Sequence, residues 1–263
     1  MSSIVTNQGV VHYEVSGRGK PVILLHGWLG SWGYWAETMS HLQGTYRAYA
    51  LDFWGFGDSG KRLNSFLVPD FVALVDEFMD RLGIDAAPII GHSMGVTVAL
   101  KLALEHPNRV RQVAVIGSPI DGRSLSFWLK LAGEPWAAWM LWKFPFTLNT
   151  FLKLFSLRAT KESQRWYKMV TKDVSDTTLD SFFSSIRSLH HTDLTARLPK
   201  ISVPVMGIYG HRDIIVNPNQ ADVLEKHTPR PYIFRLPGSG HFPMLDEPDT
   251  FHHHLLHFVY HDV

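Results

Sequence analysis

The stretch PIIGHSMGVTVAL, residues 88–100, contains the pattern Gly-x-Ser-x-Gly around Ser93. An apolar run precedes the pattern and a run with helical character follows it, so the serine lies where a strand gives way to a helix. Gly91 and Gly95 suit a sharp turn in which larger side chains would collide. The five-residue pattern alone is common, but this context is the one that a nucleophile elbow requires.

The alternation of strand and helix continues over most of the chain. Several strand candidates are near-continuous apolar runs, which is typical of strands buried on both faces of a parallel sheet. Helix candidates lie between them, for example at residues 68–83, 94–107 and 248–260. The pattern predicts one large α/β domain built on a doubly wound parallel sheet. The strand candidates are residues 9–17, 21–27, 46–53, 87–93, 110–119, 203–210 and 231–238.

The alternation fails in the middle of the chain, in a segment that holds five of the nine tryptophans. Pro135 and Pro145 divide this segment into short helices. We expect residues 119–192 to form a helical cap, or lid, inserted into a core made of residues 1–118 and 193–263. Its aromatic side chains predict a wide apolar roof over the carboxyl edge of the sheet. The candidate pocket residues are Phe127, Trp128, Trp136, Trp139, Trp142 and Phe242.

The run WAAWMLWKFPF, residues 136–146, allows a second interpretation, because aromatic side chains next to Lys143 are typical of segments that touch a membrane surface. From the sequence we favour the apolar pocket over a membrane contact.

A serine hydroxyl becomes a nucleophile only when a base removes its proton and a third group orients that base. His241 lies just after the last strand candidate, and Asp213 lies just after the preceding one. Because the carboxyl ends of parallel strands meet at one edge of the sheet, both are expected close to Ser93. Asp121 follows an earlier strand and is the alternative acid. His26, His92 and His211 lie in neighbouring motifs and are interpreted as supports of the loops.

The reaction of a serine with a carbonyl also needs donors for the negative oxygen that develops. LLHGW, residues 24–28, ends a strand and would point the backbone N–H of Trp28 inward, while Met94 supplies a second N–H at the start of the helix.

These motifs together resemble the α/β-hydrolase superfamily. HGW, DFWGFGDSG, GHSMG, GHRD and GSGHFPMLDEP occur in that family's order and cover nearly the whole chain except the cap. The resemblance implies an α/β-hydrolase fold, with a mostly parallel doubly wound sheet and a helical cap, of the esterase and lipase branch. It implies that Ser93 is the nucleophile, Asp213 the acid and His241 the base, with Trp28 and Met94 as the oxyanion donors.

Gly55-Phe-Gly-Asp-Ser-Gly60 fits the glycine pattern of a dinucleotide site. No helix pattern opens directly after it, so we interpret it as a structural loop and expect no cofactor. His253, His257 and His261 share one face of a helix, but without a carboxylate among them a surface helix is the favoured interpretation, and no metal is expected.

The amino-acid composition limits the classes of molecule that the protein is expected to bind. The 263 residues have a net charge of +1, no cysteine and no concentrated basic stripe, which argues against nucleic-acid binding and excludes disulfides and a thiol nucleophile. The first residues lack the features of a signal peptide, so a cytoplasmic protein is expected.

The sequence therefore predicts a cofactor-independent serine hydrolase that acts on carboxylic esters with a hydrophobic acyl or alcohol part. Related chemistry on the same residues stays open, namely thioester, lactone or C–C bond hydrolysis or perhydrolysis, because the fold does not choose among these reactions. A ligand receptor with slow turnover is the alternative from another class.

Overall fold

A computed structural model describes residues 2–61 and 65–260, without the side chains of Ala138, Trp142, Pro145 and Thr147. The described residues form a sheet with the strand order β1-β2-β4-β3-β5-β6-β7-β8. From β4 to β8 all neighbouring strands are parallel, and β1 and β2 extend the sheet as antiparallel strands at one edge. The strands are β1 Ser2–Val5, β2 Val10–Gly17, β3 Lys20–Leu25, β4 Tyr46–Leu51, β5 Ala87–His92, β6 Val110–Ile116, β7 Val205–Gly210 and β8 Pro231–Leu236.

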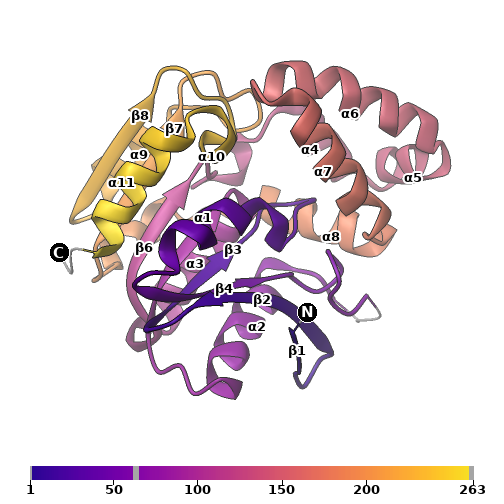
Figure 1. Ribbon diagram of the computed structural model, residues 1–263. Helices are drawn as coiled ribbons and strands as arrows, with labels where there is room; N and C mark the ends of the chain where they lie inside the picture. The colour runs from indigo at the N-terminus through magenta and orange to yellow at the C-terminus, as the bar shows by residue number, and fades with distance from the viewer. Residues whose placement is uncertain (1, 62–64, 261–263) are drawn as a thin grey trace.

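Helices cover both faces of this sheet. In Figure 1, α1 (Ala36–Leu42) and α11 (Pro248–Tyr260) lie on the near face, and α2 (Val68–Arg81) and α3 (Met94–Glu105) lie on the far face. The short helices α9 (Gln220–His227) and α10 (Pro243–Asp246) flank the last two strands. The doubly wound sheet predicted from the sequence is therefore confirmed.

The middle strands explain the apolar runs in the sequence. Every residue of β5 and β7 is buried, and so are Val22–Leu25 of β3, because helices cover both faces at these positions. In register, Leu24 of β3 lies opposite Ile90 of β5, and Ile90 lies opposite Ala114 of β6. The carboxyl ends of β3, β5, β6, β7 and β8 consequently lie along one edge.

Four elements outside the cap segment were not predicted by name: β1, α1, α9 and α10. β1 pairs with β2 through a turn in which the Thr6 N–H donates to the Gly9 carbonyl at 2.9 Å, and its four residues are too short to give a periodic signal. The helices α1, α9 and α10, of seven, eight and four residues, are also short.

Five helices stand between β6 and β7, in the segment for which the sequence predicts a cap. They are α4 (Phe127–Ala132), α5 (Pro135–Lys143), α6 (Pro145–Ala159), α7 (Ser163–Ser175) and α8 (Leu179–His190). Pro135 and Pro145 each begin a helix, where a missing N–H costs no hydrogen bond. These helices form the upper right part of the molecule in Figure 1. Three of the hydrogen bonds in the described residues join α8 to the core. The Trp28 indole donates to the Phe182 carbonyl at 3.0 Å, the Ser181 hydroxyl donates to the Gly55 carbonyl at 2.9 Å, and the Val68 N–H donates to the Ser188 hydroxyl at 3.0 Å.

In the part of the chain that the structure describes, no helix has the length and apolar character needed to cross a membrane.

Candidate active site

Ser93 occupies a sharp turn between β5 and α3. Its backbone has φ 51° and ψ −118°, a conformation that residues other than glycine rarely adopt. The surrounding contacts must therefore hold it in place. The Ser93 N–H donates to the Ile116 carbonyl at 2.9 Å, and the Ser118 hydroxyl donates to the Ser93 carbonyl at 3.1 Å. These bonds to the end of β6 stabilise the strained turn.

The two glycines of the motif are needed because of backbone contacts. A Cβ atom at Gly91 would lie 2.6 Å from the backbone nitrogen of Val96, and a Cβ at Gly95 would lie 2.4 Å from the carbonyl oxygen of Leu25. Neither neighbour is a flexible side chain, so any larger residue would displace the strand or the helix. The first turn of α3 consequently packs directly on β3.

His241 and Asp213 meet at the carboxyl edge of the sheet. His241 lies in the loop after β8, and Asp213 lies in the loop after β7. The Nδ1 atom of His241 is 2.8 Å from Oδ2 of Asp213, and both residues are buried. The other carboxylate oxygen of Asp213 accepts the backbone N–H groups of Ile215 and Val216 at 2.8 and 2.9 Å. These three contacts fix the carboxylate and direct the imidazole.

Asp121, the alternative acid, lies elsewhere. It follows β6, and its carboxylate accepts the Arg123 N–H and the Arg123 guanidinium at 2.9 and 2.8 Å. The structure therefore brings Asp213, and not Asp121, to the imidazole of His241.

The two expected oxyanion donors flank Ser93. Trp28 lies in the turn after β3, which the Gly30 N–H closes by donating to the Gly27 carbonyl at 3.2 Å, and Met94 is the first residue of α3. Within the described residues, neither the Trp28 nor the Met94 backbone N–H has a hydrogen-bond acceptor. The N-terminus of α3 adds a positive potential at the same place.

Two buried histidines support these loops. The imidazole of His26 accepts the Phe53 N–H at Nε2, at 2.9 Å, so its Nδ1 carries the proton and donates to the Gly27 carbonyl at 2.7 Å. His92 donates from Nε2 to the His241 carbonyl at 2.9 Å. Burial lowers the pKa of His26, and burial together with the neighbouring His241 lowers the pKa of His92 well below its usual value. Both rings are held neutral, which suits structural supports.

A cavity of about 70 Å³, here called the serine cavity, lies in front of Ser93. Ser93 and His241 both line it, although no hydrogen bond joins their side chains in the described structure. Such bonds often tighten only when substrate binds. The other residues that line the serine cavity are Trp28, Leu29, Tyr34, His92, Leu129, Phe151, Leu152, Phe155, Trp166, Val170, Ile215 and Phe242.

A second cavity, here called the cap chamber, lies beside the first under the cap helices and has a volume of about 340 Å³. It shares Trp28, Leu29, Leu129, Phe151 and Leu152 with the serine cavity. Every side chain around it is apolar, apart from the indole N–H of its tryptophans. Its remaining lining residues are Trp128, Leu131, Ala132, Trp136, Ala137, Met140, Leu141, Leu148 and Phe182.

The predicted pocket residues divide into three groups. Phe242 lines the serine cavity, and Trp128 and Trp136 line the cap chamber. Phe127 and Trp139 line neither cavity and are 68% and 49% exposed, because the turn of their helices directs them outward. The side chain of Trp142 lies outside the described residues.

Several residues of these walls are not among the candidate pocket residues named from the sequence. Trp166 and Val170 lie one turn apart on the buried face of α7, and Tyr34 precedes α1. The Tyr34 and Trp166 rings both pack on Phe242, with ring centroids 5.8 and 5.5 Å away. The only signal for the α7 residues is helical spacing, which does not tell a wall of a cavity from ordinary core.

Asp173 also lies on this face of α7, where the cap meets the core. Its side chain is buried, and in the described structure its Oδ2 has no hydrogen-bond partner. Burial raises the pKa of Asp173 to about 7, against the opposing effect of the Ser31 hydroxyl, and the negative charge of Asp52 adds to the rise.

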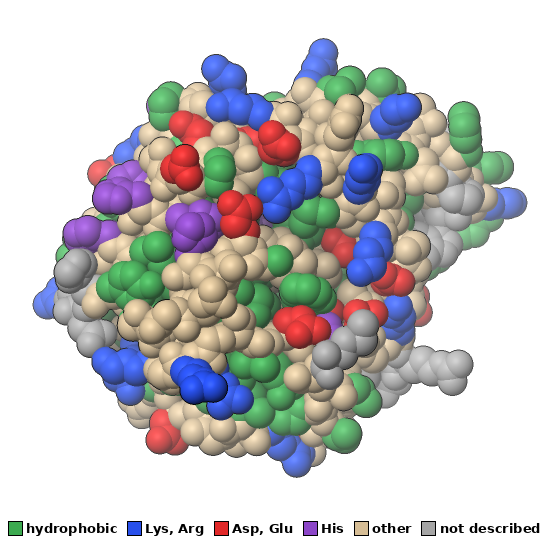
Figure 2. Space-filling view, viewed as in Figure 1, with side chains coloured by type: hydrophobic (Ala, Val, Ile, Leu, Met, Phe, Trp, Pro, Cys, Tyr) green, Lys and Arg blue, Asp and Glu red, His purple; other side chains and the backbone are tan. Residues whose placement is uncertain are grey.

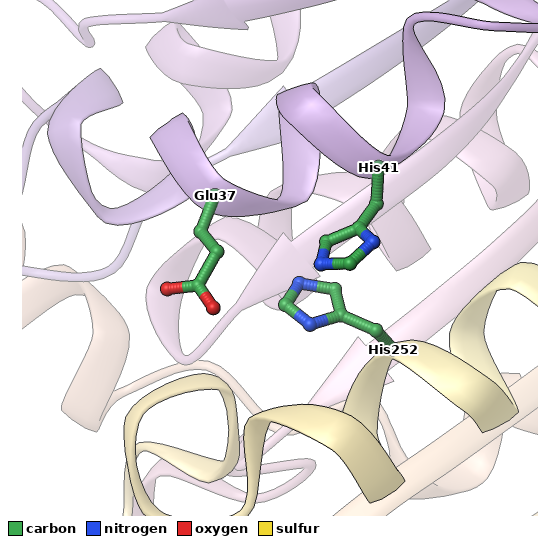
Figure 3. A group of neighbouring side chains, drawn as sticks. All are labelled: Glu37, His41 and His252. Carbon is green, nitrogen blue, oxygen red and sulfur yellow. The ribbon is translucent and has the colours of Figure 1, made fainter.

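A group of potential metal ligands lies away from Ser93, between α1 and α11 (Figure 3). The ligand atoms of Glu37, His41 and His252 all lie within 4.8 Å of one another. Each side chain has a protein partner, however. The imidazoles of His41 and His252 pack against each other, with ring centroids 4.1 Å apart and planes tilted by 30°. Thr38 bonds to His252 Nε2 at 3.1 Å and Arg165 pairs with Glu37 at 3.3 Å, so we interpret the group as a contact between α1, α7 and α11.

The glycine-rich loop forms a closed turn. The Gly55 N–H donates to the Gly60 carbonyl at 2.8 Å, and the next helix, α2, begins only at Val68. A dinucleotide site would need a helix that starts directly after the last glycine. The Gly55 carbonyl instead accepts the Ser181 hydroxyl of the cap.

Comparison with known proteins gives relatives over the whole chain. The pimeloyl-[acyl-carrier protein] methyl ester esterase of Nitrosomonas europaea is 27% identical over 92% of this chain and 96% of its own length. An esterase from Exiguobacterium antarcticum has the same fold, with a TM-score of 0.85, 21% identity and 96% of each chain covered. The enol-lactonase from Burkholderia xenovorans superimposes with a TM-score of 0.84 and 19% identity, over 99% of this chain and 100% of its own. The family model described as alpha/beta hydrolase fold matches residues 20–248, and the chain therefore belongs to the α/β-hydrolase family.

Proposed function

We propose that this protein is a serine hydrolase that cleaves carboxylic esters with an apolar acyl chain, and that Ser93, His241 and Asp213 carry the reaction. The observation that carries the proposal is the 2.8 Å contact of His241 Nδ1 with Asp213, beside a cavity that Ser93 also lines. The Nδ1–H group of His241 donates a hydrogen bond to Asp213 in this proposal, so that Nε2 carries the lone pair that acts as the base.

In the proposed reaction, His241 Nε2 takes the hydroxyl proton of Ser93 while Oγ attacks the ester carbonyl. The oxygen of the tetrahedral intermediate accepts the backbone N–H groups of Trp28 and Met94. His241 then gives its proton to the leaving alcohol, and an acyl-enzyme remains. Water, deprotonated by His241, attacks the acyl carbon; the proton returns to Ser93 and the acid leaves.

The shape of the cavities supports an acyl chain as the apolar part of the substrate. The cap chamber is lined by apolar side chains, and Leu129, Phe151 and Leu152 line both it and the serine cavity. A chain that enters the chamber loses contact with water along its length, which contributes about 0.8 kcal/mol for each methylene group. The relative from Nitrosomonas europaea is named as a methyl ester esterase, which supports an ester as the scissile group.

The test is a series of p-nitrophenyl esters of increasing acyl length. We expect kcat/KM to rise about fourfold with each added methylene until the chamber is full. Ser93→Ala is expected to lower turnover by several orders of magnitude without changing the circular dichroism spectrum or the unfolding midpoint. Multiple turnover in Ser93→Ala would refute the role of Ser93.

The same experiment separates the alternatives. A single burst of p-nitrophenol equal to the amount of enzyme would indicate a ligand receptor with slow turnover. Faster reaction with a matched acyl thioester, lactone or diketone than with the ester would replace the ester in the proposal and leave the roles of the three residues in place.

A further inference from the structure

Exposed apolar side chains cover the outside of the cap. In α5, Trp136, Trp139 and Met140 are 63%, 49% and 45% exposed. With Lys143 they stand at positions i, i+3, i+4 and i+7 of the helix, so they share one face. Ala137, the residue after Trp136, is buried and lines the chamber. The helix therefore turns a strip of large apolar side chains to solvent.

The neighbouring helix α6 repeats this arrangement. Phe146, Leu154 and Leu157 are 82%, 64% and 68% exposed, and Leu148 and Leu152 on the other side are buried. We call the exposed residues Trp136, Trp139, Met140, Phe146, Leu154 and Leu157 the outer cap face. A soluble protein seldom exposes so many large apolar side chains on adjoining helices unless another surface covers them.

The charge around the outer cap face is positive. Lys130, Lys143, Lys153 and Arg158 lie in residues 127–158, with Glu134 as the single acidic residue. Figure 2 shows hydrophobic and basic side chains side by side along the upper right of the molecule, where Figure 1 places α5 and α6. The Nζ atom of Lys143 lies 4.5 Å from the centre of the Trp139 ring. Aromatic side chains with basic neighbours are typical of helices that lie in the surface of an anionic membrane.

The cap chamber lies next to this face. Trp136 and Met140 of the outer cap face, and the exposed Trp128, also line the chamber. Five residues line both the chamber and the serine cavity. Apolar side chains therefore stand along the whole distance from the outer cap face to the serine cavity.

We propose that the outer cap face binds the surface of an anionic lipid bilayer, and that the substrate's acyl chain enters the cap chamber directly from the lipid. A second copy of the chain fits the face less well, because a twofold interface would place the positive surface of one copy against that of the other. The docking stands without the catalytic assignment, and only the delivery of the acyl chain rests on the proposed function.

Sedimentation of the full chain with vesicles tests the docking. One set of vesicles contains phosphatidylcholine and phosphatidylglycerol, and the other contains phosphatidylcholine alone. We expect binding to the anionic vesicles that weakens with salt, and at least tenfold weaker binding to the neutral vesicles. Ser93→Ala is expected to bind as the unchanged protein does, so this result is independent of catalysis.

Paired variants test which side chains are responsible. Trp139→Ser with Phe146→Ser removes two exposed rings that line neither cavity, and is expected to weaken vesicle binding at least tenfold. Lys143→Gln with Lys153→Gln is expected to weaken binding to anionic vesicles about thirtyfold at low salt. The matched control, Val5→Ser with Tyr232→Ser, removes exposed apolar groups outside the cap and is expected to bind normally. Circular dichroism and thermal unfolding check that each variant is folded.

Three results would overturn the proposal. The first is the absence of binding to anionic vesicles, and the second is unchanged binding of the Trp139→Ser, Phe146→Ser variant. The third is evidence that something else covers the outer cap face. Such evidence would be a dimer in analytical ultracentrifugation that the Trp139→Ser, Phe146→Ser variant dissociates. Binding of a purified acidic acyl carrier protein to this face, without binding of vesicles, would be equivalent evidence.

Discussion

Replacement of Asp173 by Asn should make the protein more stable, and increasingly so as the pH rises. Asp173 is 3% exposed at the contact of α7 with the core, and its Oδ2 has no partner in the described structure. Burial raises its pKa from 3.8 to about 7, so the folded protein keeps a proton that the unfolded chain releases at lower pH. The asparagine amide has the shape of the protonated acid but does not ionise.

The direction and the size of the expected stability change follow from the raised pKa of Asp173. Because the folded state binds the extra proton, the free energy of unfolding of the unchanged protein falls as pH rises from about 4 to about 7 and then levels off. The rise of the Asp173 pKa from 3.8 to about 7 lowers the free energy of unfolding by about 4 kcal/mol above pH 7. At pH 5, where the carboxyl of the unfolded chain is already ionised, it lowers that free energy by about 2 kcal/mol. The stability difference between Asp173→Asn and the unchanged protein should therefore widen by about 2–3 kcal/mol between pH 5 and pH 8.

The assay is urea unfolding at constant ionic strength over this pH range, followed by both tryptophan fluorescence and far-ultraviolet circular dichroism. Coincidence of the two curves establishes that cap and core unfold together, which a single free energy requires. Asp222→Asn, at an exposed carboxylate on α9, measures the effect of replacing a carboxylate by an amide without burial. A stability difference that stays constant from pH 5 to pH 8 would refute the reasoning, because it would mean that Asp173 has the same pKa in both states.

The remaining predictions concern the elbow, the acid and the chamber. Gly95→Ala should cost about 2–3 kcal/mol of stability, since its Cβ would lie 2.4 Å from the Leu25 carbonyl, whereas Gly44→Ala, with open space around it, should change the urea midpoint little. Asp213→Asn should lower kcat by about four orders of magnitude, because the amide favours the wrong imidazole tautomer, while Asp121→Asn should leave the rate of ester hydrolysis unchanged. Ala137→Phe should fill the cap chamber, lower kcat/KM for the longest esters and spare the shortest, and an unchanged chain-length profile would exclude the chamber as the acyl site.

The sheet and the residues at its edge were predictable because local sequence determines them. The buried runs of β3, β5 and β7 carry the signal of a parallel sheet, and the turn at Ser93 needs small neighbours that the sequence displays. Once the strands are parallel, the loops that follow them converge at one edge. The contact of His241 with Asp213 then requires only that each follow its own strand.

The cap was predictable as a segment but not in detail. Whether an aromatic side chain faces the chamber or the solvent depends on the phase of a short helix and on how that helix rests on the core, and the sequence fixes neither. Trp136 and Trp139 are both aromatic and lie within one turn, yet only Trp136 lines the chamber. Asp173 was missed for the same reason, because its burial arises only when α7 lies against Ser31 and its neighbours.

The aromatic content of the cap therefore has two separate causes. The chamber accounts for aromatic residues of α5 and α6 that line it, such as Trp136 and Phe151. It does not account for Phe146 or Trp139, which line no part of it and yet stay exposed at a cost in solubility. If the chamber alone had shaped the cap, polar residues at these outward positions would serve equally well. The outward aromatic strip thus points to a second apolar surface outside the protein. Because Trp136 of this strip also lines the chamber, a lipid surface that holds the substrate is the simplest partner.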